Sequence, residues 1–316
     1  MSRSIFFIAL FMLASVTQLL AKQGESIFDR WSYVDNKTIT LHYNLDTLKA
    51  NRYTDNVMRG TIVDGGRRFG VDITVRGRYR RRVCELPPIK LQFDKDLLRL
   101  AGLNTHNDYK LVTPCTCDPA GNEAILREQL AYELYQTVDP AASFRTQLLT
   151  INYVNTADGS TSSSYAILIE DTDELEDRLD ADNCKECLNA PLAQYTNIER
   201  VTLFQYMIGN VDFCTRQRRN LKLMRTKDDR LTAVPYDFDY STMVDPDYVS
   251  VGKREFVWKF EQAGDFIQPV ADFLALEATL MQQVEQFSPL DQKSKRQITK
   301  QFKSFFKELR TQPIGS

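Results

Sequence analysis

The chain has 316 residues, of which 43% are hydrophobic and 26% are charged. This balance indicates a globular protein that is long enough to bury a large core, and it argues against a disordered chain. The formal net charge is only -2, so the chain as a whole has no general attraction to nucleic acid or to an anionic membrane.

The first 21 residues have the layout of a secretory signal. A basic residue, Arg3, precedes an apolar run that begins at Ile5 and continues to Ala21. The alternative is a single membrane anchor, but the run is short for a full span and is interrupted by polar residues. We therefore expect residues 1–21 to be removed, the mature protein to be secreted or periplasmic, and no stable membrane insertion to follow.

Residues 22–170 are predicted to form a β-rich part with one embedded helix. Apolar and β-branched runs between turn residues predict strands at residues 38–43, 60–63, 71–76, 89–93, 148–153 and 165–169. Between the fourth and fifth strands, residues 123–135 carry leucines at four-residue spacing and are predicted to be helical. At about 100° per residue, Glu123 and Glu133 share the leucine stripe, whereas Glu128 points away from it.

Residues 171–316 are predicted to be mainly helical. Amphipathic patterns cover residues 173–179, 198–208 and 272–287, and a last helix ends at Arg310. A short hairpin follows the helix at 198–208, with strands at residues 221–224 and 231–234. The whole pattern predicts an α+β fold of two lobes, with a cleft between a β-rich lobe and a helical lobe.

The six cysteines are an even number, and export would place them in an oxidising compartment. They are Cys84, Cys115, Cys117, Cys184, Cys187 and Cys214. We expect disulfides rather than a zinc site, because the cysteine pairs are far apart and have no nearby histidine. The first pairing expected is Cys84 with Cys115 or Cys117. Only two histidines occur, His42 and His106, which leaves little for a Ser or Cys hydrolase triad.

The predicted hairpin is flanked by an acid, an amide and a second acid. Asp212 follows the helix at 198–208, Asn220 opens the first strand, and Asp237 ends the second. These groups can meet across a hairpin, where they would position a hydroxyl and hold magnesium beside a phosphate. Taken singly, each has a plain structural explanation as a helix cap, a turn residue or a strand end. Their order together favours a metal and phosphate site.

A basic segment precedes the fourth predicted strand. If the segment is extended, alternation places four arginines on one face: Arg76, Arg78, Arg80 and Arg82. Such a line would bind phosphates, although charges that keep an exposed strand soluble, or a heparin-like or nucleic-acid contact, would give the same pattern. Lys90 lies inside an apolar strand, where an ammonium group needs a partner, and we expect Glu123 or Glu133 to supply it.

From about residue 38 to residue 244 the chain resembles the spore-coat protein H (CotH) kinases. The resemblance is carried by the Arg76-Gly77 strand, the Lys90 strand, and the segment from Ile125 to Leu134. It is also carried by Ile167-Leu-Ile-Glu170, Asn210-Val-Asp212, Arg219-Asn220-Leu-Lys-Leu and Val234-Pro-Tyr-Asp237-Phe-Asp239. This family consists of secreted or coat-associated proteins with an atypical protein-kinase-like fold, so the resemblance implies a two-lobed kinase-like arrangement here.

The resemblance also implies roles for individual residues. Asp212 would be the catalytic acid, and Asn220 and Asp237 would be the metal ligands. The nucleotide phosphates would be contacted by a basic residue, either Lys90 or the nearby Arg78 and Arg80. Glu170 would lie near the hinge between the lobes.

The leading functional prediction is an exported kinase that uses ATP and magnesium to phosphorylate a protein hydroxyl. One alternative is a pseudokinase that binds without transferring phosphate. A second is an extracellular binding or scaffold protein whose arginine strand contacts an acidic partner. A third is a metal-dependent phosphohydrolase, because a carboxylate beside a metal activates water as readily as a hydroxyl. Nucleic acid is not an expected partner.

Overall fold

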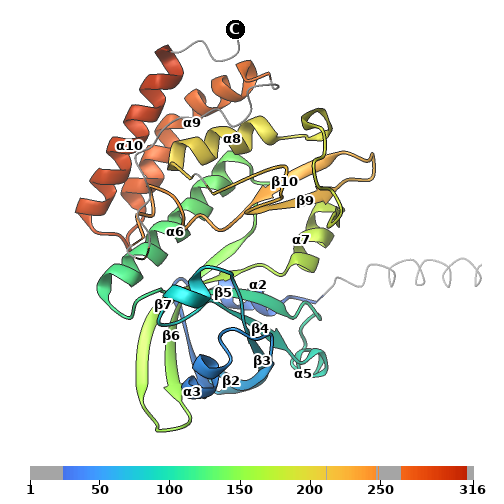
Figure 1. The fold of residues 1–316 in the computed structure, drawn as a ribbon, viewed down its shortest axis with the longest axis vertical. Coiled ribbons are helices and arrows are strands. Elements are labelled where there is room, and N and C mark those ends of the chain that lie inside the picture. The colour runs from blue at the N-terminus through green and yellow to red at the C-terminus, as the bar shows by residue number, and fades with distance from the viewer. Residues whose placement is uncertain (1–23, 211, 247, 249–264, 312–316) are drawn as a thin grey trace, which may run out of the picture.

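The computed structural model describes residues 24–210, 212–246, 248 and 265–311. The predicted signal segment, residues 1–21, lies outside the described residues. Among the helices of these ranges, none combines the length and the apolar character needed to cross a bilayer. Figure 1 shows a barrel of strands at one end of the molecule and a group of helices with a small sheet at the other.

Seven strands close into a barrel in the order β1-β2-β3-β4-β5-β7-β6. Neighbouring strands pair antiparallel except β1 and β6, which pair in parallel from Lys37↔Leu149 to Tyr43↔Asn155. That pairing joins the first strand to a late one and leaves no open edge on this sheet. The strands are β1 (Lys37–Tyr43), β2 (Met58–Asp64), β3 (Arg67–Val75), β4 (Ile89–Phe93), β5 (Asp108–Val112), β6 (Thr146–Asn155) and β7 (Thr161–Ile169).

The barrel core is aromatic and aliphatic, because alternate residues of each strand face inward. Phe93 packs edge-to-face against Trp31, Phe69 and Tyr109. The Trp31 indole Nε1 donates a hydrogen bond to Asp64 Oδ2 at 2.9 Å, which satisfies its buried donor. Short helices lie around the barrel: α2 (Ile27–Ser32), α3 (Leu45–Ala50), α4 (Arg80–Val83) and α5 (Lys95–Leu100).

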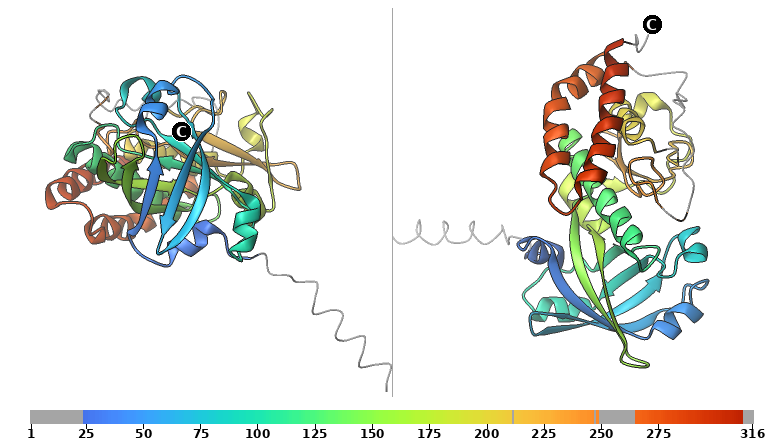
Figure 2. Two further views of the ribbon diagram at one scale, coloured as in Figure 1. Left: turned by 90° about the horizontal axis from the view of Figure 1, so that it is seen from below. Right: turned by 90° about the vertical axis from the view of Figure 1, so that its left-hand side faces the viewer.

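Helix α6 (Pro119–Val138) lies between the barrel and the other helices, as the right-hand view of Figure 2 shows. It packs against β6 and β7 on one side and against α8 and α9 on the other. The helix is therefore buried nearly all round, and Glu128 is only 1% exposed, while Glu123 and Glu133 are partly exposed. The prediction that Glu128 points away from the core is wrong, because a helix packed on several sides has no single buried stripe.

The remaining elements form a second hydrophobic core with α6. A three-stranded sheet of order β10-β9-β8 packs beside the helices, and Phe302, Phe305 and Phe306 of α10 are fully buried. The elements are α7 (Thr172–Leu179), β8 (Asp182–Asn183), the 3₁₀ helix η1 (Leu192–Gln194), α8 (Ile198–Ile208), β9 (Leu221–Arg225), β10 (Leu231–Pro235), α9 (Ile267–Gln286) and α10 (Gln292–Thr311).

The predicted two-lobed, protein-kinase-like α+β arrangement is wrong. Its individual elements were located well, since β4 occupies the predicted residues 89–93 and α8 the predicted residues 198–208. The predicted fold is contradicted because the N-terminal strands close into a mixed barrel instead of forming a sheet-based lobe. Two features close the barrel. One is the parallel pairing of β6 with β1, and the other is β5, an additional strand that joins β4 to β7 and was not predicted from the sequence.

Two disulfides are present, as expected in general terms from the cysteine count. Cys84 is bonded to Cys115, the first of the two predicted partners, and Cys184 is bonded to Cys187. Cys117 is an exposed free thiol and Cys214 a partly buried one. The Cys84–Cys115 bond ties the turn after α4 to the segment that leads into α6.

Candidate functional site

A cavity of about 1190 Å³ lies where loops of the barrel meet loops of the helical part. The barrel contributes the segment after β3, from Arg76 to Arg80. The helical part contributes the turn before β9, the segment after β10, and Leu188 and Asn189 from the loop after β8. Six arginines and three aspartates line the cavity: Arg76, Arg78, Arg80, Arg216, Arg218, Arg219, Asp212, Asp237 and Asp239.

The acid, amide and second acid predicted from the hairpin come together in this cavity. The Asn220 amide Nδ2 donates to the Asp212 backbone carbonyl at 3.0 Å and lies 3.3 Å from Asp212 Oδ2. The same amide is 3.4 Å from the Asp237 backbone carbonyl. Asn220 therefore joins the segment after α8 to the segment after β10. The amide orientation follows from these contacts, because only the Nδ2 side of the amide can donate to carbonyl oxygens.

Asp212 follows the end of α8, where Gly209 has a left-handed backbone with φ of 68°. A side chain at this glycine would place Cβ 2.0 Å from Thr242 Oγ1, so the close approach of the two segments requires glycine. The Asp212 carboxylate accepts a hydrogen bond from Arg219 Nη1 at 2.9 Å through Oδ1. The Asp212 carboxylate is thus held from two sides, by Arg219 and by Asn220.

Left-handed backbone recurs at three further residues of the cavity wall. Arg218 has φ of 50°, Asn220 of 55° and Asp237 of 64°. This region is uncommon for residues other than glycine, and such residues gather at functional sites where the surrounding structure holds them in place. Asp237 is held by helix α6, because its backbone N–H donates to the Tyr132 hydroxyl at 2.9 Å.

The environment of Asp237 favours its protonated form. Burial, and then the nearby Asp239, raise the pKa of its carboxyl against the opposing effect of Arg76 and Arg80, and the net value is about 6. Several carboxylates in a partly buried wall repel one another, and a bound cation would relieve that repulsion. The donor set of this wall consists of carboxylate and amide oxygens, which are the ligands that magnesium prefers.

A buried charge cluster lies behind this wall. Arg80 is 8% exposed, and its Nη1 lies 3.8 Å from Asp239 Oδ2. Its guanidinium donates to the Thr113 backbone carbonyl and stands 5.5 Å from the centre of the Tyr248 ring. Glu128 of α6 belongs to the same cluster: burial, then Asp239, raises its pKa well above the ordinary value, while Arg80 lowers it.

Two of the residues predicted from the resemblance lie outside the residues that line this cavity. Lys90 on β4 pairs with Asp108 at 3.1 Å and not with Glu123 or Glu133, so the predicted partner of Lys90 is wrong. Glu170 is fully buried and forms ion pairs with Arg145 and Arg178, at 2.8 and 3.0 Å. In contrast, Arg78 and Arg80 both line the cavity.

The arginine segment differs from its predicted form. Strand β3 ends at Val75, Gly77 is left-handed with φ of 79°, and residues 80–83 form the short helix α4. Arg80 therefore turns inward and becomes buried, whereas Arg78 stays exposed. An extended strand with all four arginines on one face is wrong, and the glycine at position 77 was the available sign of a turn.

The sequence pattern assigned no role to Asp239, Glu128 or Tyr248. Asp239 follows Asp237 at a spacing of two, which in a regular strand places both on one face, and this was the available signal. Glu128 gave no such signal, because its burial depends on the packing around α6. Tyr248 comes from a separate segment, and its hydroxyl hydrogen-bonds to Asp239.

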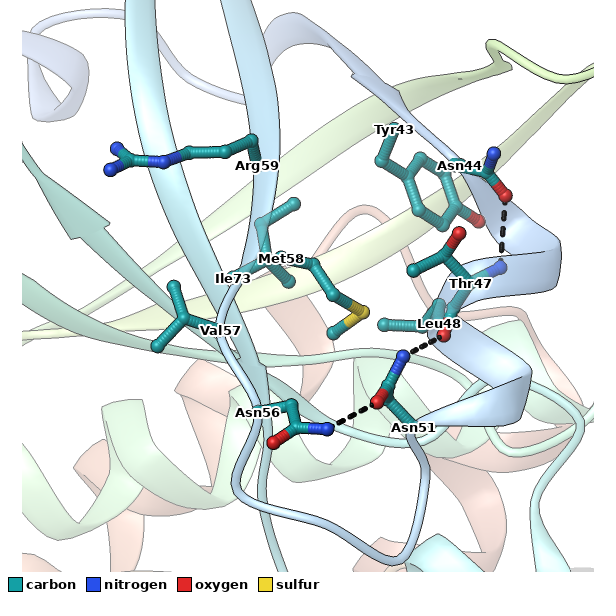
Figure 3. A pocket seen from close by; sticks show the side chains of 10 residues that line it. All are labelled: Tyr43, Asn44, Thr47, Leu48, Asn51, Asn56, Val57, Met58, Arg59 and Ile73. Carbon is teal, nitrogen blue, oxygen red and sulfur yellow. Dashed lines mark hydrogen bonds between the residues drawn. The ribbon is translucent and has the colours of Figure 1, made fainter.

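A second cavity of about 550 Å³ lies against the barrel, beside α3. Figure 3 shows Met58 extending toward Leu48, with Asn51 and Asn56 joined by a hydrogen bond at the rim. Arg59 is the single charged residue among those that line it, and the Arg59 side chain is 85% exposed. Among the described residues, this cavity therefore lacks the acids and fixed cations that a metal and phosphate site requires.

Searches with family models and against curated proteins find no match to this chain. The resemblance to the CotH kinases thus stays a prediction.

Replacing Asp237 by asparagine is expected to raise the free energy of unfolding by about 1 kcal/mol near pH 8. The folded-state pKa of Asp237 is above the ordinary value of 3.8, so the folded chain holds this proton more tightly than the unfolded chain. Ionisation therefore costs stability as the pH rises through about 6, and this cost is absent below about pH 4. Denaturant unfolding near pH 8 and below about pH 4, in a buffer without divalent ions, measures the effect.

The matched control is Asp55→Asn, because the Asp55 side chain is 97% exposed. This control should leave stability nearly unchanged at both pH values. If Asp237→Asn destabilises the protein at the higher pH as much as at the lower, the Asp237 carboxylate is well compensated in the folded chain and the electrostatic description of this wall is wrong.

Proposed function

We propose that this protein is a magnesium-dependent phosphotransferase that moves the γ-phosphoryl group of ATP to a hydroxyl of a protein substrate. The observation that carries the proposal is the meeting of Asp212, Asn220 and Asp237 in a cavity lined by arginines. Phosphoryl transfer needs a carboxylate to orient the acceptor, oxygen ligands for metal, and fixed positive charge. The cavity has a candidate for each requirement.

Asp212 is proposed to orient the acceptor hydroxyl and to receive its proton. The hydroxyl oxygen forms the new bond to the γ-phosphorus, and the bond to the ADP oxygen breaks. Arg219 and Asn220 hold the Asp212 carboxylate, so its position is set before the substrate binds. This preorganisation reduces the entropic cost of reaching the reactive geometry.

Asp237 and Asn220 are proposed to hold magnesium through their side-chain oxygens. When bound, magnesium would neutralise the phosphate charge that develops during transfer. The Asn220 Nδ2 atom is engaged with the Asp212 and Asp237 segments, which leaves Oδ1 as the ligand atom of that amide. Loss of the Asp237 proton near pH 6 would accompany metal binding, because a carboxylate must be ionised to act as a ligand.

The nucleotide phosphates are assigned to arginines of the segment after β3. Arg76 and Arg80 lower the pKa of the Asp237 carboxyl, so their positive charges lie near it. Arg78 is exposed on the cavity wall. Guanidinium groups bind phosphate oxygens in pairs and keep their charge at any physiological pH. This assignment replaces Lys90, whose ammonium already pairs with Asp108.

One chemistry recurs on unrelated folds, so a barrel in place of a kinase-like lobe is compatible with phosphoryl transfer at this cavity. We also propose that the protein works outside the cytoplasm, in the secreted or periplasmic space, after removal of residues 1–21. Two disulfides are compatible with such an oxidising compartment.

Asp212→Ala and Asp237→Ala are each expected to lower phosphoryl transfer by at least about a hundredfold. The first change removes the group that orients the acceptor, and the second removes a metal ligand. Transfer is measured with ATP labelled at the γ-phosphate, using autophosphorylation and a mixture of protein acceptors. Melting in the presence of ATP and magnesium measures binding separately, because a ligand of the folded state raises stability by mass action.

Asp55→Ala serves as the surface control and should keep full transfer. Retained transfer in either site variant would reject the roles given to Asp212 and Asp237. Release of free phosphate without a labelled acceptor would instead favour a phosphohydrolase. Stabilisation by ATP and magnesium without any turnover would favour a pseudokinase.

Arg78→Gln and Lys90→Gln separate the two assignments for the phosphate contact. The Arg78 change should raise the KM for ATP by about tenfold, because a charged hydrogen bond to phosphate is lost. The Lys90 change should leave that KM within about twofold, since Lys90 lies outside the cavity lining. A larger rise in the KM for ATP in Lys90→Gln than in Arg78→Gln would make Lys90 the phosphate contact and contradict the assignment to Arg78.

A further inference from the structure

The second disulfide lies in a Cys-x-x-Cys segment, a spacing that dithiol redox sites use. Cys184 and Cys187 enclose only Lys185 and Glu186, directly after the two-residue strand β8. The Glu186 side chain is 75% exposed and Leu188 is 54% exposed, whereas the two cysteines are buried. The disulfide therefore closes a short surface loop with its sulfur atoms on the inner side.

A guanidinium group contacts both sulfur atoms of this disulfide. Arg225 Nη2 on β9 lies 3.0 Å from Cys184 Sγ and 3.1 Å from Cys187 Sγ. A positive charge at this distance stabilises a thiolate far more than a neutral disulfide, so it favours the reduced form of the pair. Glu186 and Asp229 also pair with Arg225, but solvent screens their exposed carboxylates and leaves the guanidinium as the charge nearest the sulfurs.

The other disulfide provides an internal comparison. Cys84 and Cys115 are also buried, and they are separated by 31 positions. Within the described part of the chain, no arginine or lysine side chain donates a hydrogen bond to either of these sulfurs, and Arg52 donates to the Cys84 backbone carbonyl instead. The two disulfides therefore differ in the charge that faces the sulfur atoms.

The Cys-x-x-Cys loop is attached to the arginine-rich cavity at both of its ends. At the start of the loop, the Cys184 backbone carbonyl accepts a hydrogen bond from Arg218 Nη1. Just after the loop, the Asn189 backbone N–H donates to the Arg216 carbonyl at 3.2 Å. Leu188, Asn189 and both arginines line the cavity. The loop thus supports the part of the cavity wall that carries these arginines.

We propose that Cys184–Cys187 is a reducible disulfide whose oxidation state sets the affinity of the arginine-rich cavity for its anionic ligand. The co-reactant is a dithiol reductant. The effect on ATP affinity depends on the function proposed above for that cavity. The ease of reduction and the change in the loop do not depend on it.

Reduction proceeds by thiol–disulfide exchange. One thiolate of the reductant attacks Cys187 Sγ, the S–S bond breaks, and its electron pair leaves on Cys184 Sγ as a thiolate beside Arg225. The second thiolate of the reductant then attacks the mixed disulfide and releases Cys187, while the reductant becomes a disulfide. In total, two electrons and two protons pass from the dithiol to the cysteine pair. The attack requires the loop to open, and β8 holds it to β9 by only two residue pairs.

Reduction is expected to loosen the loop without unfolding the chain. The two cysteines are only three positions apart, so the bond removes little entropy from the unfolded chain. In the folded chain, reduction frees the two Cα atoms from their separation of 5.5 Å. Arg218 then loses a fixed acceptor, and Leu188 and Asn189 lose a fixed place in the wall. A looser wall binds an anion more weakly, because binding must order it again.

The first test measures the reduction potential of each disulfide. The mature protein is equilibrated in dithiothreitol redox buffers, its thiols are alkylated, and each cysteine is followed by mass spectrometry. Cys184–Cys187 should be reduced at a higher potential than Cys84–Cys115. Arg225→Gln should lower the equilibrium constant for reduction of Cys184–Cys187 by about tenfold, which is about 30 mV for a two-electron couple. Arg225→Lys keeps the charge and should restore most of this loss.

The matched control is Arg230→Gln. Arg230 is an exposed arginine of the same hairpin and donates to the Tyr195 carbonyl rather than to sulfur. This variant should leave both potentials unchanged. Equal potentials for the two disulfides, or an Arg225→Gln effect no larger than that of Arg230→Gln, would overturn the redox assignment.

The second test measures the cavity in the oxidised and reduced protein. Isothermal titration with magnesium and a non-hydrolysable ATP analogue should show about fivefold weaker binding after reduction, and the double variant Cys184→Ser, Cys187→Ser should match the reduced form. By linkage, the bound analogue should make Cys184–Cys187 harder to reduce by the same factor. Hydrogen exchange should become faster at residues 184–189 and 216–219 in the reduced protein.

Unchanged hydrogen exchange at residues 184–189 and 216–219 after reduction would overturn the coupling between the disulfide and the cavity wall. Equal affinity of the two forms for the analogue would overturn it as well. If the analogue binds neither form, the kinase function fails, and hydrogen exchange alone then decides whether the disulfide controls the wall.

Discussion

The hydrogen bond from the Asp237 backbone to the Tyr132 hydroxyl is the contact on which the arrangement of the site depends. Tyr132 belongs to α6, which is buried between the barrel and the helical core. Its ring packs on Phe238 with ring centres 4.8 Å apart, so the helix holds both the backbone of Asp237 and the side chain of the residue that follows it. One turn earlier, Glu128 of the same helix brings a carboxyl to the cluster around Arg80. A single helix thus ties the barrel's arginines to the hairpin's acids.

This arrangement places charge where burial makes it costly. Burial and the nearby Asp239 raise the pKa of Asp237 and the pKa of Glu128, and Arg80 offsets these shifts only in part. Groups with strongly shifted pKa values in a cavity are typical of functional sites, because chemistry needs them and stability alone does not.

The sequence predicted the local elements well and the long-range arrangement poorly. The hairpin strands and α8 follow from hydrophobic periodicity, and the hairpin alone was enough to bring Asp212, Asn220 and Asp237 together. Barrel closure was beyond that reasoning, because the parallel pairing of β1 with β6 joins residues more than a hundred positions apart and leaves no local pattern. Arg80 and Glu128 were misplaced for a similar reason: a regular periodicity was assumed where Gly77 turns the chain and where α6 is enclosed on several sides.

The most direct test of the account is a structure of the protein with magnesium and a non-hydrolysable ATP analogue. The account predicts a magnesium ion about 2.1 Å from side-chain oxygens of Asp237 and Asn220, with the nucleotide phosphates against Arg78 and Arg80 and the terminal phosphate facing Asp212. A nucleotide bound elsewhere, or a metal ion that contacts neither Asp237 nor Asn220, would contradict it.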